Sequence, residues 1–181
     1  MFQLSEYAQK ELLTLARQSV RQFLLAGKKN IQNSVNPELQ ARLGAFVTLH
    51  NQRCLRGCIG MIGPASPLFE TVQECAISAA TLDSRFDSVS ISELEAINIE
   101  ISVLSPLAPV RDFAEIEVGV HGLIVSGQER RGLLLPQVAT EHRWDRETFL
   151  QQTCRKAGLP LDAWQKGAKV MSFTAFVFSE K

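Results

Sequence analysis

The residues best suited to nucleophilic chemistry lie in the segment Leu55-Arg56-Gly57-Cys58-Ile59-Gly60. Side chains alternate along an extended strand, so we expect Arg56 and Cys58 to share one face. A guanidinium about 6 Å from a thiolate stabilises it by roughly 2–3 kcal/mol at an effective dielectric of about 20, which corresponds to about two pKa units. A thiol pKa of about 8.5 would then fall towards neutrality, and Cys58 would be a nucleophile. The alternative is that Cys58 is a small apolar side chain with a structural role only.

The neighbours of Cys58 bear on the same question. Gly57 and Gly60 leave little bulk beside the thiol, so that backbone or a ligand could approach closely. Regular alternation puts Cys54 on the Cys58 face, about 13 Å away, which is too far for a disulfide or a shared metal ion. Cys75 and Cys154 fall on apolar faces of predicted helices and are expected in the core.

A catalytic thiol needs a base within hydrogen-bond reach. His121 is the best candidate, because the glycines of Gly119-Val120-His121-Gly122 flank it as glycines flank Cys58. His50 is nearer in sequence, but a hairpin would set it beside Arg53. A lone histidine is more often structural, and that alternative stays open for His121. Asp83 and Arg85 are interpreted as loop residues that follow a helix.

Hydrophobic periodicity predicts helices and strands in mixed order, without a regular βαβ rhythm, which indicates the α+β class. A first helix is expected between a Ser5 cap and Gly27, a second after a Ser66 cap, and a third after an Asp145 cap. Strands are expected over residues 45–50, 54–62, 97–103, 118–125, 132–135 and 170–178. Residues 28–42 and 83–87 are expected as loops.

Composition excludes several classes of protein. The 181 residues suit one domain with its own core. Lys+Arg and Asp+Glu both count 19, and this balance argues against nucleic-acid binding. No apolar stretch is long enough to span a bilayer, and the N-terminus lacks the features of a signal peptide, so we expect no membrane association and a cytoplasmic location. The cysteine spacing does not resemble a zinc framework, and we expect no metal and no cofactor; metal binding through Cys58 with His121 is kept as a third alternative.

The hexapeptide Leu55–Gly60 resembles the signature of the AMMECR-domain family. The resemblance continues through much of the chain, in segments 44–49, 83–86, 99–105, 121–123, 132–139 and 156–160. It implies one AMMECR-type domain over residues 1–181, with two subdomains that each hold an antiparallel sheet and helices. The larger subdomain would contain both termini, and the smaller would come from the middle of the chain. The hexapeptide, with Leu55, Gly57, Ile59 and Gly60 as binding residues, would line the cleft between them.

The resemblance also implies partners. Prokaryotic members resemble protein A of the AmmeMemoRadiSam system, which is named together with a Memo-type protein and a radical SAM protein. The family has no assigned reaction. Our leading hypothesis is an enzyme, or a component of one, in which Cys58 is the nucleophile, Arg56 stabilises its thiolate and His121 is the base. The competing hypothesis is a non-catalytic module that binds a protein or peptide in the same cleft.

Overall fold

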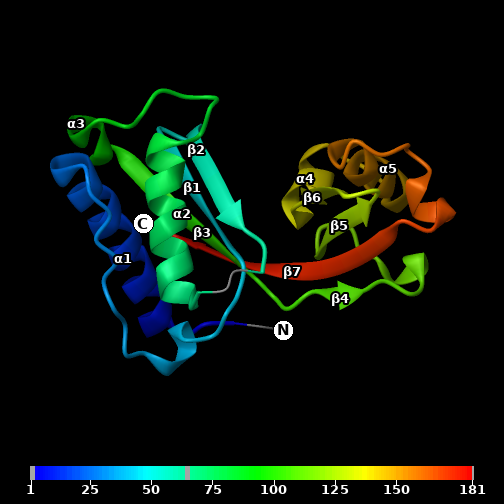
Figure 1. The fold of residues 1–181 in the computed structure, drawn as a ribbon, viewed down its shortest axis with the longest axis horizontal. Coiled ribbons are helices and arrows are strands. Elements are labelled where there is room, and N and C mark those ends of the chain that lie inside the picture. Colours follow the sequence, from blue (N-terminus) through cyan, green and yellow to red (C-terminus); the bar gives the residue numbers. More distant parts are fainter. Residues whose placement is uncertain (1–2, 64–65, 181) are drawn as a thin grey trace. The chain divides into compact units, whose positions relative to one another are not determined.

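The computed structural model describes residues 3–63 and 66–180, and it divides into two compact units. The larger unit comprises the chain up to Leu104 together with the residues from Phe176 onward, and the smaller unit comprises Ser105–Ala175. Both units combine helices with antiparallel strands, so the predicted α+β class is confirmed (Figure 1). Within the described ranges, no helix is long and apolar enough to cross a membrane.

The larger unit packs two long helices on one face of an antiparallel sheet (Figure 1). Strands β1 and β2 form a hairpin, and β3 pairs with the other side of β1. The last residues of β7 come next to β3 in the order of the sheet. The elements of this unit are α1 (Glu6–Ala26), η1 (Pro37–Leu39), β1 (Ala45–Asn51), β2 (Cys54–Met61), α2 (Leu68–Thr81), α3 (Ile91–Leu94) and β3 (Ile97–Leu104). β2 is the edge strand of the sheet.

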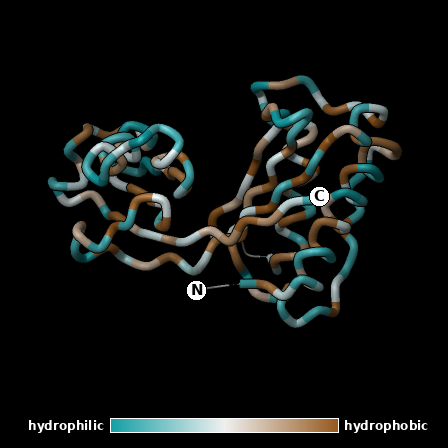
Figure 2. Tube along the Cα trace, turned by 180° about the vertical axis from the view of Figure 1, so that it is seen from behind, coloured by the Kyte–Doolittle hydropathy of each residue, from teal (hydrophilic) through white to brown (hydrophobic). Residues whose placement is uncertain are grey.

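Alternating apolar residues of β1 and β3 form the core of this unit together with α1 and α2. Val47, Leu49, Ile99 and Ile101 are fully buried on the helix-covered face of the sheet. Figure 2 shows the hydrophobic residues following the strands and helices, whereas the connecting loops are largely hydrophilic. The alternation read from residues 97–103 therefore reports a true half-buried strand.

The first helix has the predicted ends. The Ser5 hydroxyl accepts from the N–H of Ala8, and Gly27 ends the helix in the left-handed region. The predicted Ser66 cap is wrong. The N-cap position of α2 is occupied by Pro67, and among the described residues no side chain caps the first turn of the helix with a hydrogen bond. Pro67 therefore lies directly before the helix.

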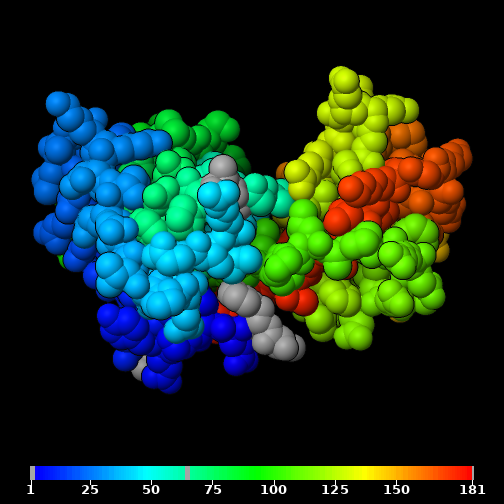
Figure 3. Space-filling model, turned by 60° about the horizontal axis from the view of Figure 1, so that its bottom comes forward, coloured from blue at the N-terminus to red at the C-terminus, as the bar shows by residue number. Residues whose placement is uncertain are grey.

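The loop expected over residues 28–42 is present, and it is packed on the helices. Gln73 of α2 hydrogen-bonds both the N–H and the carbonyl of Gln32, and Ser34 donates to Glu11 of α1. Figure 3 shows this light-blue segment lying against the surface of the larger unit. These polar contacts tie the loop to both α1 and α2.

The smaller unit is built on strands β4 (Ala108–Pro109), β5 (His121–Gly127), β6 (Arg130–Leu134) and the first part of β7 (Lys169–Ser179). β7 pairs with β4 and β5, and β5 pairs with β6. The helical elements are η2 (Phe113–Glu115), α4 (Pro136–Glu141), α5 (Arg146–Lys156) and η3 (Ala163–Lys166). Asp145 caps α5 through the N–H of Thr148, as predicted.

Both hairpins turn through two residues without glycine. Gln52 and Arg53 connect β1 to β2, and Gln128 and Glu129 connect β5 to β6, all four with positive φ. Positive φ at both central residues matches the strand twist but normally selects Asn or Gly. The strands expected over residues 118–125 and 132–135 left residues 126–131 as their connection, which is too long because this turn lacks the residues that usually mark it.

Gly57 lets α2 approach β2 closely. A Cβ at this position would lie 2.2 Å from the backbone oxygen of Ala79. Backbone can move away only if the whole helix shifts, so no larger residue fits without repacking. The glycine before Cys58 therefore serves helix–strand packing.

We predict that Gly57→Ala lowers the free energy of unfolding by about 1–3 kcal/mol, as is usual for overpacking in a rigid core. Gly127→Ala is the matched control, because its Cβ would meet only side chains, at 3.7 Å and 3.8 Å. Urea unfolding of both variants measures the difference. Equal stability of Gly57→Ala and wild type would contradict the close approach of α2 to β2.

Candidate functional site around Cys58

Strand β2 carries a β-bulge at Arg56. Gly57 lies opposite Leu49 and Leu55 lies opposite His50, which leaves Arg56 without a partner on β1. Because directly opposite residues share a sheet face, the extra residue reverses the alternation. Leu55 therefore lies on the Cys58 face, and Cys54 lies on the other. The predictions that Arg56 and Cys54 share a face with Cys58 were wrong, since regular alternation does not continue through a bulge.

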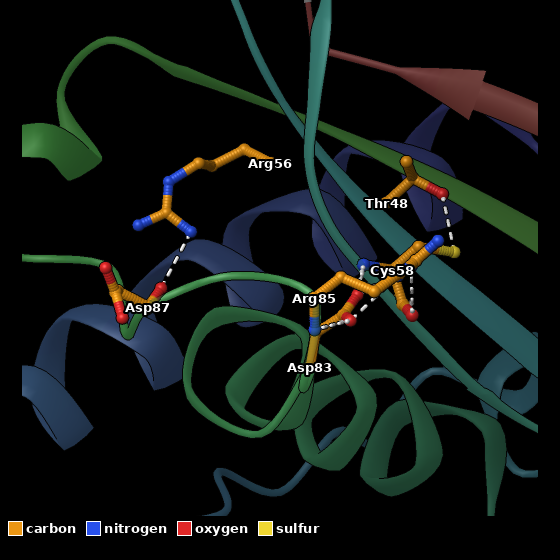
Figure 4. Close-up of polar contacts among 6 residues, drawn as sticks. All are labelled: Thr48, Arg56, Cys58, Asp83, Arg85 and Asp87. Carbon is orange, nitrogen blue, oxygen red and sulfur yellow. Dashed lines mark hydrogen bonds and ion pairs between the residues drawn. The ribbon is translucent and has the colours of Figure 1, made fainter.

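The bulge directs Arg56 to an acidic partner. Its Nε and Nη2 donate to the two carboxylate oxygens of Glu93, at 2.6 Å and 3.1 Å, and its Nη1 donates to the carbonyl of Asp87 at 2.8 Å. Figure 4 shows the side chain extending away from Cys58. The hydrogen bonds from Arg56 lower the pKa of Glu93 against the opposing effect of burial. The expected partnership of Arg56 with the Cys58 thiolate is therefore replaced by an ion pair with Glu93.

Cys58 is fixed on two sides. Thr48, directly opposite on β1, donates a hydrogen bond from its hydroxyl to Sγ at 3.3 Å. The backbone N–H of Cys58 donates to Oδ2 of Asp83 at 2.8 Å. The side chain is half-buried, and these contacts orient the sulfur and its backbone together (Figure 4).

Asp83 and Arg85 form a bidentate ion pair beside Cys58. Nε and Nη2 of Arg85 donate to Oδ1 and Oδ2 of Asp83, at 2.9 Å and 2.6 Å. These hydrogen bonds hold the pKa of the Asp83 carboxyl well below its usual range, although burial acts in the opposite direction. The carboxylate side chain is 5% exposed and the guanidinium side chain 55% exposed. The pair thus joins a buried anion to a cation that still reaches solvent.

This ion pair completes the open edge of the sheet. An edge strand leaves backbone groups without a neighbouring strand. At Cys58, Asp83 accepts from the N–H, and Nη2 of Arg85 lies 3.5 Å from the carbonyl oxygen. The two side chains thus take the place of a neighbouring strand at this one residue.

The remaining residues of the hexapeptide have distinct surroundings. A Cβ at Gly60 would overlap the ring of Phe46, so this glycine accommodates an aromatic side chain. Ile59 packs against the core of the larger unit, whereas Leu55 is 41% exposed. Of the predicted binding residues, Leu55 is the one whose side chain is most available to a ligand.

His121 belongs to the smaller unit, as the first residue of β5. Its Nδ1 accepts a hydrogen bond from the backbone N–H of Glu117 at 3.0 Å. This hydrogen bond joins the imidazole ring to the turn before β5, which is a structural role for His121. A catalytic role for His121 beside Cys58, and a cleft between the two subdomains, stay predictions.

The other three cysteines differ in burial, and the two that were expected in the core lie there. Cys75 and Cys154 are buried in the two cores, and burial raises the pKa of the Cys75 thiol to about 12. Cys54 is exposed at the start of β2. Within the described ranges, no group of three or more His, Cys, Asp or Glu residues is arranged to hold a metal ion.

Sequence reasoning missed Thr48, Glu93 and the role of the Asp83–Arg85 pair. Asp83 and Arg85 do lie in the predicted loop after the second helix, but their contacts with Cys58 were not predicted. The segment Asp83-Ser84-Arg85-Phe86 nevertheless belongs to the pattern shared with the AMMECR-domain family. That shared pattern was the available signal that these loop residues have a specific task.

Comparison with known proteins identifies the family. The AMMECR1 family model matches residues 13–178. A protein of Methanothermobacter thermautotrophicus is 44% identical over 180 residues, covering 94% of this chain and 93% of its own. Protein PF1979 of Pyrococcus furiosus is 42% identical and covers 100% of this chain and 92% of its own.

A solved structure shows the same fold. The crystal structure of the uncharacterized protein PH0010 from Pyrococcus horikoshii superposes with a TM-score of 0.91 at 39% identity, covering 99% of this chain and 95% of that one. The protein is therefore of the mixed α+β type seen in PH0010. The chain belongs to the AMMECR1 family, as the hexapeptide predicted.

We predict that Asp83→Asn lowers the free energy of unfolding at pH 7 by about 1–3 kcal/mol, because it leaves the half-buried Cys58 N–H and the Arg85 guanidinium with a poorer acceptor. The folded-state pKa of Asp83 is depressed. The contribution of Asp83 to the free energy of unfolding is therefore fully present at pH values above its unfolded-state pKa of about 3.9, and it is lost as the pH falls through its folded-state pKa. Urea unfolding at several pH values measures the difference from wild type.

The matched control is Asp87→Asn in the same loop, where an exposed carboxylate should change stability by less than about 0.5 kcal/mol. A difference for Asp83→Asn that disappears already between about pH 7 and 5 would contradict the depressed pKa.

Proposed function

We propose that this protein is a cysteine-dependent enzyme, or a component of one, in which Cys58 forms a transient covalent bond to its substrate. The observation that carries the proposal is the set of polar contacts that surrounds Cys58. Cys58 is half-buried, its sulfur accepts a hydrogen bond from Thr48, and Asp83 fixes its backbone N–H. A cysteine needed only as a small apolar side chain requires none of these polar contacts.

Arg85 takes over the electrostatic role first assigned to Arg56. Its guanidinium reaches the Cys58 carbonyl and remains 55% exposed, so it can meet a substrate that approaches from solvent. Arg56 acts from the other side of the same surface, where Glu93 holds it in place. Action together with Memo-type and radical SAM proteins, and His121 as the base, remain parts of the proposal.

A non-catalytic module that binds a peptide is the second candidate. Leu55, 41% exposed on the Cys58 face, favours it, because an exposed leucine beside an edge strand suits contact with another chain. In that case Cys58 would contribute shape and not chemistry. The two candidates differ in what happens when the sulfur is replaced by oxygen.

We predict that the folded protein reacts with p-nitrophenyl acetate in a burst of one equivalent or less, in which the Cys58 thiolate takes the acetyl group and p-nitrophenolate leaves. The burst should be absent from Cys58→Ser, because a serine hydroxyl is a far weaker nucleophile at neutral pH. Absorbance of p-nitrophenolate measures it, and intact-protein mass spectrometry locates the acetyl group.

Cys54→Ser is the matched control and should keep the full burst, since Cys54 lies on the opposite face of β2. An acetyl group on Cys54, or an unchanged burst in Cys58→Ser, would favour the binding module over the enzyme.

A further inference from the structure

The sheet of the smaller unit has one face covered by helix α5. Val125 of β5 lies opposite Gly132 of β6 and Val170 of β7, and both valines are buried in the core that α5 completes. A Cβ at Gly132 would lie 2.2 Å from the backbone nitrogen of Ala157, directly after α5. Since side chains alternate along a strand, the residues next to these positions face the other side of the sheet.

A row of polar residues crosses this other face. Ser126 of β5 is paired with Arg131 of β6 and also with Lys169 of β7. Neighbouring strands are about 4.8 Å apart, so the Cα atoms of the two cationic residues flank Ser126 at a separation of about 10 Å. All three residues line one hollow, which has a volume of about 410 Å³. The register therefore brings two cations and a hydroxyl to the same hollow.

The two cations of this row have no counter-ion in the part of the chain that the structure describes. Neither Arg131 nor Lys169 forms a salt bridge there, and both side chains are exposed. Like charges set close together on one face of a sheet are destabilising. An anion bound between them would offset this repulsion, whereas the fold alone gains nothing from the arrangement.

The lining of the hollow is positive as a whole. Arg130 and Glu129 also line it, and their opposite charges balance, which leaves the charges of Arg131 and Lys169. Arg130 is held by a hydrogen bond from its Nη1 to the carbonyl of Gly158, at 2.6 Å. Arg131 and Lys169 are therefore the cations available to a ligand, and a dianion would neutralise the hollow.

The rest of the hollow is largely apolar. Leu107, Ile124 and Met171 line it. Ile124 is paired with Met171, two residues along the strands from Ser126 and Lys169, so this pair lies on the same face as the cationic row. Ile124 is buried, and Met171 is half-buried. A ligand that fills the hollow therefore has an apolar body next to its charged group.

A phosphate monoester fits this combination better than a carboxylate does. A carboxylate carries one negative charge, whereas a phosphate monoester carries about 1.5 to 2 at pH 7. Its three terminal oxygens can accept from a guanidinium, an ammonium and a hydroxyl at the same time. The volume of the hollow lies in the range of small-molecule sites.

We propose that this hollow binds a small organic phosphate monoester. The phosphate group lies between Arg131 and Lys169 and accepts from the Ser126 hydroxyl. The apolar body of the ligand packs on Ile124 and Met171. This site would bind its ligand whether or not Cys58 is a nucleophile.

The test titrates the ¹⁵N-labelled full chain at pH 7 with phenyl phosphate, inorganic phosphate, benzoate and benzyl alcohol. We expect phenyl phosphate to shift the backbone amide signals of residues 124–131 and 169–171 saturably. Benzoate should bind at least about tenfold more weakly, because it cannot match both cations. Inorganic phosphate should also bind about tenfold more weakly, because it lacks the apolar body. Benzyl alcohol, which has no charge, should cause no saturable shift.

Arg131→Gln and Lys169→Gln should each weaken phenyl phosphate binding at least about tenfold, because each removes a charge-assisted hydrogen bond. Arg155→Gln is the matched control. It removes one positive charge from the exposed surface of α5 and should leave the affinity unchanged. In urea unfolding, Arg131→Gln and Lys169→Gln should be no less stable than wild type, because each relieves the repulsion between the two cations. A loss of binding is thereby distinguished from a loss of folding.

Three results would overturn the inference: benzoate or inorganic phosphate binding as tightly as phenyl phosphate, unchanged affinity in both hollow variants, or no saturable shift with phenyl phosphate. Binding of N-acetyl-phosphotyrosinamide at least about tenfold more tightly than phenyl phosphate would also overturn it, because the ligand would then be a phosphorylated protein and not a small molecule.

Discussion

The candidate site depends on the carboxylate of Asp83. This side chain is 5% exposed, and it accepts from the Cys58 N–H as well as from the Arg85 guanidinium. A buried carboxylate is unfavourable unless it is paired and hydrogen-bonded, and here both conditions are met by the site itself. Asp83 follows α2, so it ties the end of that helix to the edge of the sheet. The edge strand, the thiol and the exposed cation are thereby fixed relative to one another.

Two local features of β2 decide what surrounds the thiol. Gly57 admits the backbone of α2, which brings the loop containing Asp83 to the strand. The bulge directs Arg56 away from the Cys58 face and into an ion pair with Glu93. The guanidinium carbons of Arg56 and Arg85 lie 5.9 Å and 5.5 Å from the centre of the Phe86 ring. Each arginine is neutralised by its own carboxylate. The surface therefore offers directed hydrogen-bond donors without a large positive charge, which is consistent with a chain whose formal net charge is zero.

Much of the fold could be predicted from periodicity and from the caps at Ser5, Gly27 and Asp145, because these are local signals. The hexapeptide with Cys58 was the sequence's candidate for the site, and its role as a site stays a prediction. The partners of Cys58 were not predictable. Asp83 and Arg85 reach Cys58 through the packing of α2 on β2, and the bulge at Arg56 depends on the pairing of β2 with β1. Neither feature can be recognised from a local sequence pattern. The turn at residues 128–129 was missed for a related reason, since glutamine and glutamate adopt positive φ there under the constraint of the paired strands.

A competition between the cysteines shows whether the surroundings of Cys58 make it a nucleophile. The native protein is treated with a limiting amount of iodoacetamide, and mass spectrometry of its peptides gives the rate at each thiol. Accessibility alone would make exposed Cys54 react before half-buried Cys58, with buried Cys75 and Cys154 last. We expect Cys58 to react before Cys54, and this order to be lost in Thr48→Val, which removes the hydrogen bond to Sγ. A rate at Cys58 below that at Cys54 in the folded wild-type protein would contradict it.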